Sequence, residues 1–89
     1  MDAITTALKS LPDWENLGGK AIAKTFMFKN YYQTMAFVNA IAFIAHRQDH
    51  HPDLQVGYNQ CRVEYSTHSA GGLTEKDIAG AQAVDALSS

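Results

Sequence analysis

The chain has 89 residues, 46% of them hydrophobic, and a formal net charge of -2 with histidine neutral. This length predicts one domain, residues 1–89, and the ordinary apolar content excludes a disordered chain. A slightly acidic chain has no excess of basic residues for binding phosphates, so we expect no direct nucleic-acid partner.

Cys61 is the only cysteine, which excludes a disulfide framework within the chain and is typical of a reducing compartment. The first residues show no basic segment followed by an apolar run, so they do not predict a secretory signal. The longest apolar stretch, residues 35–45, is interrupted by Asn39 and is too short to span a bilayer. We therefore expect a cytoplasmic protein with no membrane segment.

The first third of the chain predicts a short helix followed by a β-hairpin. Apolar residues recur at helical spacing after Asp2, which is a suitable N-cap, and Pro12 ends this helix. Residues 14–17 predict a short strand and residues 20–28 a longer one, and the glycine pair between them suits a tight turn.

Residues 31–48 predict a long helix with Asn30 as its N-cap. Phe37, Ile41 and Ile44 fall on one face, and further apolar residues lie beside them. A helix that is apolar over so much of its circumference is typically buried on more than one side. One side can cover a sheet, and the other is predicted to meet a second subunit, although a wide core-facing stripe would explain the same pattern.

The second half predicts another hairpin and a last helix. Val56 and Tyr58 start a third strand, Asn59-Gln60 form the turn, and residues 61–68 alternate as a fourth strand. On that strand Glu64, Ser66 and His68 share one face, and the alternate residues Cys61, Val63, Tyr65 and Thr67 share the other.

The last helix is predicted to begin after Thr74 and to run to about Leu87. Thr74 and Asp77 have the spacing of a capping box, in which each side chain bonds the other residue's backbone. The element order is therefore α-β-β-α-β-β-α. We expect an α+β two-layer fold: a four-stranded, mainly antiparallel sheet with helices packed on one face, leaving the other sheet face or an edge for self-association.

Histidines give the strongest functional signal. His50 and His51 follow the long helix, and His68 ends the fourth strand, which returns toward the start of the third. This topology brings the three imidazoles to one end of the sheet, which Asp77 can also reach. A single loop histidine is commonly an exposed polar residue, but three converging at one strand end favour an acid–base site.

A zinc site is the competing interpretation, because His46 and His50 are four residues apart. No glutamate follows His46 as it does in the metalloprotease motif, and Cys61 is expected to face the core. We therefore predict no metal site.

The spacing of these residues carries a resemblance. His50-His51-Pro52 is followed after five residues by Tyr58, after nine more by His68 and after eight more by Asp77. This pattern resembles the signature of the pterin-4a-carbinolamine dehydratases, also known as dimerisation cofactors of a homeodomain transcription factor. The resemblance extends through residues 26–37, 66–68 and 72–77, and so over most of the chain beyond the first helix.

The resemblance implies the α+β fold, a homodimer or homotetramer, and loss of water from 4a-hydroxytetrahydrobiopterin or a related pterin to give a quinonoid dihydropterin. It implies no metal or organic cofactor, and it suggests a pterin-dependent aromatic amino acid hydroxylase as a further partner. By position, His50, His51 and His68 would be the catalytic residues of the pterin pocket. His50 and His68 would be the proton donor and acceptor in an unassigned order, and Asp77 would orient an imidazole or a ring N–H.

His46 departs from the family pattern, because the resembling enzymes usually carry glutamate four residues before the paired histidines. A carboxylate there would favour a charged neighbouring imidazole, and a histidine would not. By position, His46 would bind or orient the substrate. Its departure from glutamate predicts weaker activity or a shifted pH optimum. Two other functions stay open: a non-catalytic oligomeric adaptor, and a protein that binds a different pterin.

Overall fold

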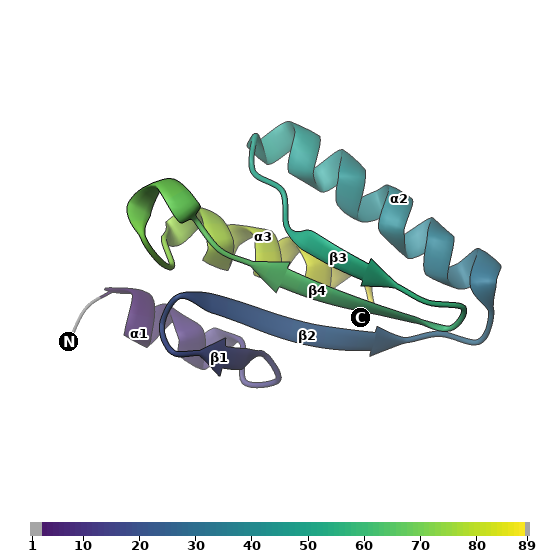
Figure 1. Ribbon diagram of the computed structural model, residues 1–89, viewed down its shortest axis with the longest axis horizontal. Coiled ribbons are helices and arrows are strands. Elements are labelled where there is room, and N and C mark those ends of the chain that lie inside the picture. Colours follow the sequence, from purple (N-terminus) through teal and green to yellow (C-terminus); the bar gives the residue numbers. More distant parts are fainter. Residues whose placement is uncertain (1–2, 89) are drawn as a thin grey trace.

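A computed structural model of the chain describes residues 3–88, which follow the predicted order α-β-β-α-β-β-α (Figure 1). The elements in chain order are α1 (Ala3–Ala7) with a 3-10 turn at Leu8–Ser10, β1 (Glu15–Leu17), β2 (Ala21–Met27), α2 (Tyr31–Gln48), β3 (Asp53–Val56), β4 (Gln60–Tyr65), a 3-10 turn at His68–Ala70, and α3 (Glu75–Leu87). The α+β fold expected from the sequence is confirmed.

The four strands form one antiparallel sheet in the order β1-β2-β4-β3. Ile22 lies opposite Tyr65 at one side of β4, and Asp53 lies opposite Glu64 at the other. The start of β3 therefore adjoins the end of β4. The segment that carries His50 and His51 joins α2 to β3, so it must pass this corner of the sheet.

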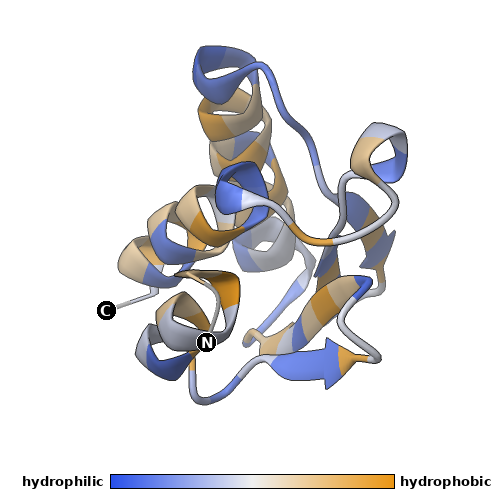
Figure 2. Ribbon diagram, turned by 90° about the vertical axis from the view of Figure 1, so that its left-hand side faces the viewer, coloured by the Kyte–Doolittle hydropathy of each residue, from blue (hydrophilic) through white to orange (hydrophobic). Residues whose placement is uncertain are grey.

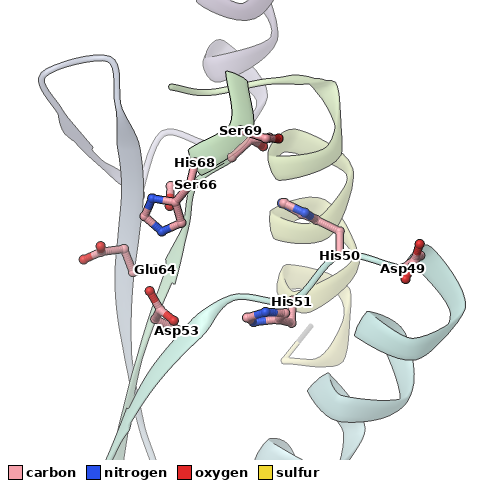
Figure 3. A pocket seen from close by; sticks show the side chains of 9 residues that line it. Asp49, His50, His51, Asp53, Glu64, Ser66, His68 and Ser69 are labelled. Atoms are coloured by element: carbon pink, nitrogen blue, oxygen red, sulfur yellow. The ribbon is translucent and has the colours of Figure 1, made fainter. Parts of the chain in front are cut away.

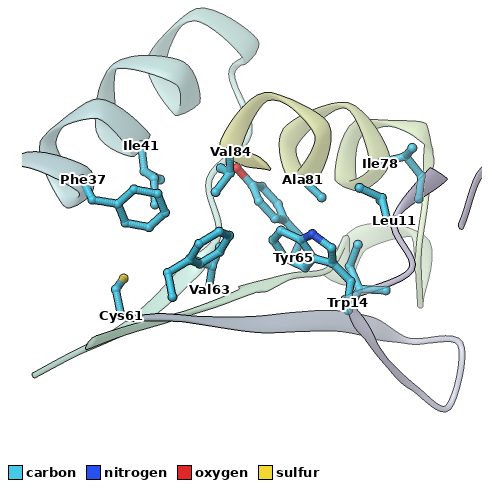
Figure 4. Close-up of a cluster of buried hydrophobic side chains, with 12 residues drawn as sticks. Leu11, Trp14, Phe37, Ile41, Cys61, Val63, Tyr65, Ile78, Ala81 and Val84 are labelled. Atoms are coloured by element: carbon cyan, nitrogen blue, oxygen red, sulfur yellow. The ribbon is translucent and has the colours of Figure 1, made fainter. Parts of the chain in front are cut away.

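The helices lie on one face of the sheet, and the core fills the space between the two layers (Figures 2 and 4). Cys61, Val63 and Tyr65 alternate along β4 and are each 0% exposed, as the period of a strand predicts. Burying a side chain of this kind contributes about 1.5–3 kcal/mol relative to its exposure. The same cluster is completed by buried side chains from the other elements: Leu11, Trp14, Ile22, Phe26, Phe37, Ile41, Ile78, Ala81 and Val84.

Local signals set both ends of α2. Asn30 caps the helix, since its side-chain oxygen accepts a hydrogen bond of 2.9 Å from the Gln33 N–H. At the other end Asp49 adopts the left-handed conformation, with φ 52° and ψ 42°. Aspartate is among the residues that tolerate this conformation. The turn it makes is closed by the His50 N–H, which donates to the Ala45 carbonyl at 3.2 Å.

One side of α2 packs on the core and another is bare. Phe37 and Ile41 are buried, whereas Tyr32 is 81% exposed and Phe43 is 63% exposed. The predicted burial of a second helix face is therefore not met within a single chain. No helix within the described residues combines the length and apolar character needed to cross a membrane.

Some predicted boundaries were wrong. β3 spans Asp53–Val56, and Tyr58 lies in the turn with Asn59, one residue earlier than predicted. The Gly57 N–H closes this turn by donating to the Gln60 carbonyl at 2.8 Å. β4 ends at Tyr65 instead of His68, because its pairing with β3 stops at Glu64 and its pairing with β2 stops at Tyr65. The predicted N-cap Asp2 lies outside the described residues.

Candidate functional site

A pocket of about 220 Å³ opens at the corner where α2, β3, β4 and the 3-10 turn at His68–Ala70 meet. Figure 3 shows its polar lining: His50 and His51 lie on the segment between α2 and β3, and His68 lies on the 3-10 turn after β4. The full lining is Asp49, His50, His51, Asp53, Glu64, Ser66, Thr67, His68 and Ser69. A second pocket of about 310 Å³ adjoins it and shares His68, Thr67, Ser66 and Glu64. The structure thus brings the three histidines to one cavity.

His50 is joined to Asp77 by the shortest polar contact at the pocket. His50 Nε2 lies 2.6 Å from Asp77 Oδ1, and the carboxylate is completely buried. A carboxylate only accepts, so Nε2 carries the proton and Nδ1 is the nitrogen left for another partner. An aspartate that holds an imidazole in this way fixes its tautomer and stabilises the positive charge it acquires on accepting a proton.

The buried Asp77 carboxylate is itself held by several donors. The Thr67 hydroxyl donates to Asp77 Oδ2 at 2.7 Å, and the Thr74 N–H donates to the same oxygen at 3.0 Å. The second of these contacts belongs to the predicted capping box, which the structure confirms. Asp77 also lies in the first turn of α3, where the helix dipole favours negative charge. Asp77 therefore both caps α3 and orients His50.

Tyr65 lies beside the His50–Asp77 pair. Its ring stacks on the His50 imidazole, with a centroid separation of 5.9 Å and an interplanar angle of 24°. Burial and the nearby Asp77 charge raise the pKa of the Tyr65 hydroxyl to about 12. The phenol therefore stays neutral at physiological pH, and it does not line the pocket.

His51 and His68 are both exposed residues that line the pocket. His51 Nδ1 lies 3.1 Å from the Pro52 carbonyl, and because a carbonyl only accepts, this contact assigns the proton to Nδ1 and leaves Nε2 free. His68 opens the 3-10 turn after β4 and lines both adjoining pockets. Two carboxylates, Asp53 and Glu64, face each other across β3 and β4 and line the same cavity.

The structure does not bring His46 to this cavity. His46 lies in the last turn of α2 with an exposed side chain, and the pocket lining does not include it. The helical spacing that suggested a zinc pair also fails, because α2 ends at Gln48 and His50 turns toward Asp77. Among the described residues, no three histidine, cysteine or acidic side chains gather in a way that could hold a metal ion.

Sequence reasoning gave no role at this site to Asp53, Glu64 or Thr67, which line the pocket, or to Tyr65, which stacks on His50. Glu64 was expected to lie on a solvated face, Thr67 and Tyr65 were placed on the core-facing side of the strand with Cys61, and Asp53 was given no role. The shared face of Glu64, Ser66 and His68 on the predicted strand was the signal that could have placed Glu64. Nothing local could have revealed the contacts of Thr67 with Asp77 or of Tyr65 with His50, because they join distant segments.

The chain is similar in sequence to known proteins over nearly its whole length. The family model described as pterin 4 alpha carbinolamine dehydratase matches residues 1–87. A protein of Nitrosospira multiformis, provisionally named a pterin-4-alpha-carbinolamine dehydratase, is 58% identical over 86 residues, covering 97% of this chain and 75% of that protein.

Two solved structures share the fold. The transcriptional coactivator/pterin dehydratase from Brucella melitensis has a TM-score of 0.89 and 34% identity, with 97% of this chain and 93% of that chain covered. A pterin dehydratase-like protein identified as a RuBisCO assembly factor in the alpha-carboxysome has a TM-score of 0.72 and 28% identity, with coverages of 84% and 88%. Together with the match over residues 1–87, these likenesses establish that the chain belongs to the pterin-4a-carbinolamine dehydratase family.

Proposed function

We propose that this protein is a dehydratase that converts 4a-hydroxytetrahydropterins, such as 4a-hydroxytetrahydrobiopterin, to the quinonoid dihydropterin and water. The observation that carries the proposal is the 2.6 Å contact between His50 Nε2 and Asp77 Oδ1, at a pocket that His51 and His68 also line. Family membership supplies the substrate class, and the imidazoles supply proton donors and acceptors near neutral pH.

The reaction needs one acid and one base. The bond from the ring carbon to its hydroxyl oxygen breaks, and that oxygen leaves as water after it takes a proton from the acid. The base removes the proton of the adjacent ring N–H, whose electron pair then forms the new C=N bond. Each well-placed group of this kind accelerates a reaction by about 10²–10⁴-fold.

We assign the base to His50. Its Nε2–H is committed to Asp77, so Nδ1 is the atom that can accept the ring proton. The buried carboxylate then stabilises the imidazolium that forms, as in other aspartate–histidine pairs. Because Asp77 is fixed by Thr67 and by the Thr74 backbone, it holds His50 without having to reorganise during the reaction.

We assign the acid to His68, which is exposed and lines both adjoining pockets. An exposed imidazole regains its proton from solvent quickly after each turnover. His51, whose free Nε2 follows from its contact with the Pro52 carbonyl, would bind the pterin or assist the transfer. His46 lies outside the pocket lining, so any influence of this side chain on the site would act at a distance.

An oligomeric adaptor is the second candidate function. Two observations favour it: the exposed Tyr32 and Phe43, and the 28% identical structural relative identified as a RuBisCO assembly factor. Tyr32 and Phe43 are about three helical turns apart and so share one face of α2. We propose that this face joins copies of the chain into a dimer or tetramer, and that the adaptor function would use the same assembly.

Sedimentation tests the assembly. Replacing both residues by aspartate should reduce the mass of the protein in solution, because charge at an apolar interface is unfavourable. Gln82→Asp, on an exposed position of α3 and away from both α2 and the open face of the sheet, is the control. An unchanged mass in the double variant would contradict this interface.

The dehydratase is tested by turnover. Purified protein is mixed with enzymatically generated 4a-hydroxytetrahydropterin, and dehydration is followed by absorbance beside His50→Ala and His68→Ala. We expect acceleration by the wild type and a loss of about 10²-fold or more in each variant. Folded variants that retain the wild-type rate would exclude the assigned acid and base. A folded wild type that does not exceed the spontaneous rate would exclude the dehydratase and favour the adaptor.

A further inference from the structure

We propose that Tyr65 is a positioning residue of the active site: its ring holds the plane of the His50 imidazole, and Gly80 of α3 provides the space in which that ring lies. The proposal rests on the dehydratase function above, in which His50 Nδ1 accepts a proton. It adds a residue that touches neither the pocket nor the substrate.

The contact with Asp77 does not by itself fix the His50 ring. Rotation about the Cβ–Cγ bond swings Nδ1 through a wider arc than Nε2, so the hydrogen bond at Nε2 tolerates some rotation of the ring. The Tyr65 ring stacks beside the imidazole at a tilt of 24°, with the two ring centroids 5.9 Å apart, so a large rotation of the imidazole would meet it. Tyr65 thereby holds the direction of Nδ1, the atom that must meet the substrate proton.

Gly80 explains how a ring as large as tyrosine fits beneath α3. A Cβ atom at residue 80 would lie 2.5 Å from both Cε1 and Cζ of Tyr65 and 2.9 Å from its hydroxyl oxygen. These distances are far inside van der Waals contact, so the ring lies directly on the helix backbone. Glycine within a helix is less stable than alanine, and the Tyr65 ring supplies the reason for its presence here.

The Tyr65 ring is also buried beside Trp14. The Trp14 and Tyr65 ring centroids are 6.3 Å apart, and Tyr65 is 0% exposed at the end of β4. Its position therefore follows from the sheet and from α3 and does not depend on a bound substrate. A rigid support of this kind is what keeps a catalytic group within the narrow range of productive geometry.

The ring, and not the hydroxyl, carries this role. The Tyr65 hydroxyl is buried and has no hydrogen-bond partner among the described residues. Because this hydroxyl makes no hydrogen bond within that part of the chain, removing it breaks no polar contact there and should leave the stack of the two rings intact. Tyr65→Phe is thus the conservative variant that should keep the positioning function.

The test compares Tyr65→Phe, Tyr65→Leu, Gly80→Ala and the double variant Tyr65→Leu/Gly80→Ala. The double variant refills part of the space lost with the ring, so it separates packing from stacking. Three readouts are taken: the urea midpoint, kcat and KM for the pterin, and the ¹⁵N resonances of the His50 ring, assigned with His50→Ala. The resonances report the tautomer and the Nε2–H bond and need no turnover.

We expect Tyr65→Phe to keep the wild-type kcat and His50 spectrum. Tyr65→Leu and the double variant should lower kcat about tenfold with KM nearly unchanged, because a displaced base loses rate and not affinity. Their His50 Nε2–H signal should broaden or shift. Gly80→Ala should do the same by displacing the ring.

A double variant that regains the wild-type urea midpoint, kcat and His50 spectrum would overturn the proposal and leave Tyr65 a packing residue. So would a Tyr65→Leu protein, folded and with an unchanged His50 spectrum. If instead the wild type turns over no pterin while the His50 spectrum changes as expected, the support of His50 stands and the dehydratase function fails.

Discussion

His50 Nε2 lies 2.6 Å from Oδ1 of Asp77, a carboxylate that is 0% exposed. The pair joins the segment after α2 to the first turn of α3. Tyr65, at the end of β4, stacks on His50, and Thr67, just after β4, donates to Asp77. One buried charge therefore links three elements and sets the tautomer of the histidine at the pocket. The predictions below follow from this contact and from the residues that support it.

Asp77→Asn should lower kcat by about 10²-fold, because the amide keeps the shape of the side chain but cannot stabilise an imidazolium. In a His50→Ala background the same change should have little further effect, since Asp77 acts through His50. Asp85→Asn is the matched control: it removes the same charge from α3, where Asp85 contacts Trp14 and Lys24 far from the pocket. Additive losses in the double variant would contradict the pairing.

Thr67→Val should weaken the support of Asp77 while keeping the size of the side chain. The lost donor, at 2.7 Å from Asp77 Oδ2, should reduce the free energy of unfolding by about 1–2 kcal/mol. We expect a smaller kcat as well, measured in the same turnover assay. Thr25→Val, on an exposed position of β2, controls for the change in side-chain chemistry. Equal stability losses in the two variants would argue against a special role for Thr67.

Tyr65 should make the protein sensitive to alkali. Its pKa rises from 10.0 to about 12 in the folded state, so between these pH values the unfolded chain has lost a proton that the folded chain still holds. Stability is therefore full below pH 10.0 and falls as the pH rises toward 12, by about 2–3 kcal/mol in all. Urea unfolding across this range should show a steeper loss for the wild type than for Tyr65→Phe. Parallel curves would refute the assignment.

His46→Glu should raise activity or move the pH profile of kcat, because a carboxylate near the site favours a charged imidazole. The exposed position of His46, outside the pocket lining, means that the effect must act through space and should weaken in high salt. His46→Gln, which adds no charge, is the control. If both variants match the wild type at low salt, His46 takes no part in the reaction.

The helices and the capping interactions could be predicted because their signals are local. Asn30 and Thr74 each accept a hydrogen bond from the first turn of the helix that follows them. The apolar residues of α2 recur at helical spacing along its 18 residues. The antiparallel sheet followed from two hairpins separated by a helix. The same topology brought His50 and His68 to one corner without any knowledge of side-chain positions.

The second hairpin was placed less well, because its register depends on pairing and not on local pattern. β3 is a short, largely exposed edge strand, so its side chains carry little alternation, and its position is set by Asp53 pairing with Glu64. The stack of Tyr65 on His50 and the space at Gly80 join residues distant in sequence. No periodicity encodes such contacts, which is why Tyr65 was expected to be an ordinary core residue.

The most direct test is the dehydration rate of 4a-hydroxytetrahydropterin with wild-type protein and with the double variant His50→Ala/His68→Ala, each compared with the spontaneous rate. The proposed acid–base mechanism predicts clear acceleration by the wild type and, for a double variant whose circular dichroism shows it to be folded, a rate equal to the spontaneous one. A wild-type protein that does not exceed the spontaneous rate, or a double variant that does so as well as the wild type, would contradict it.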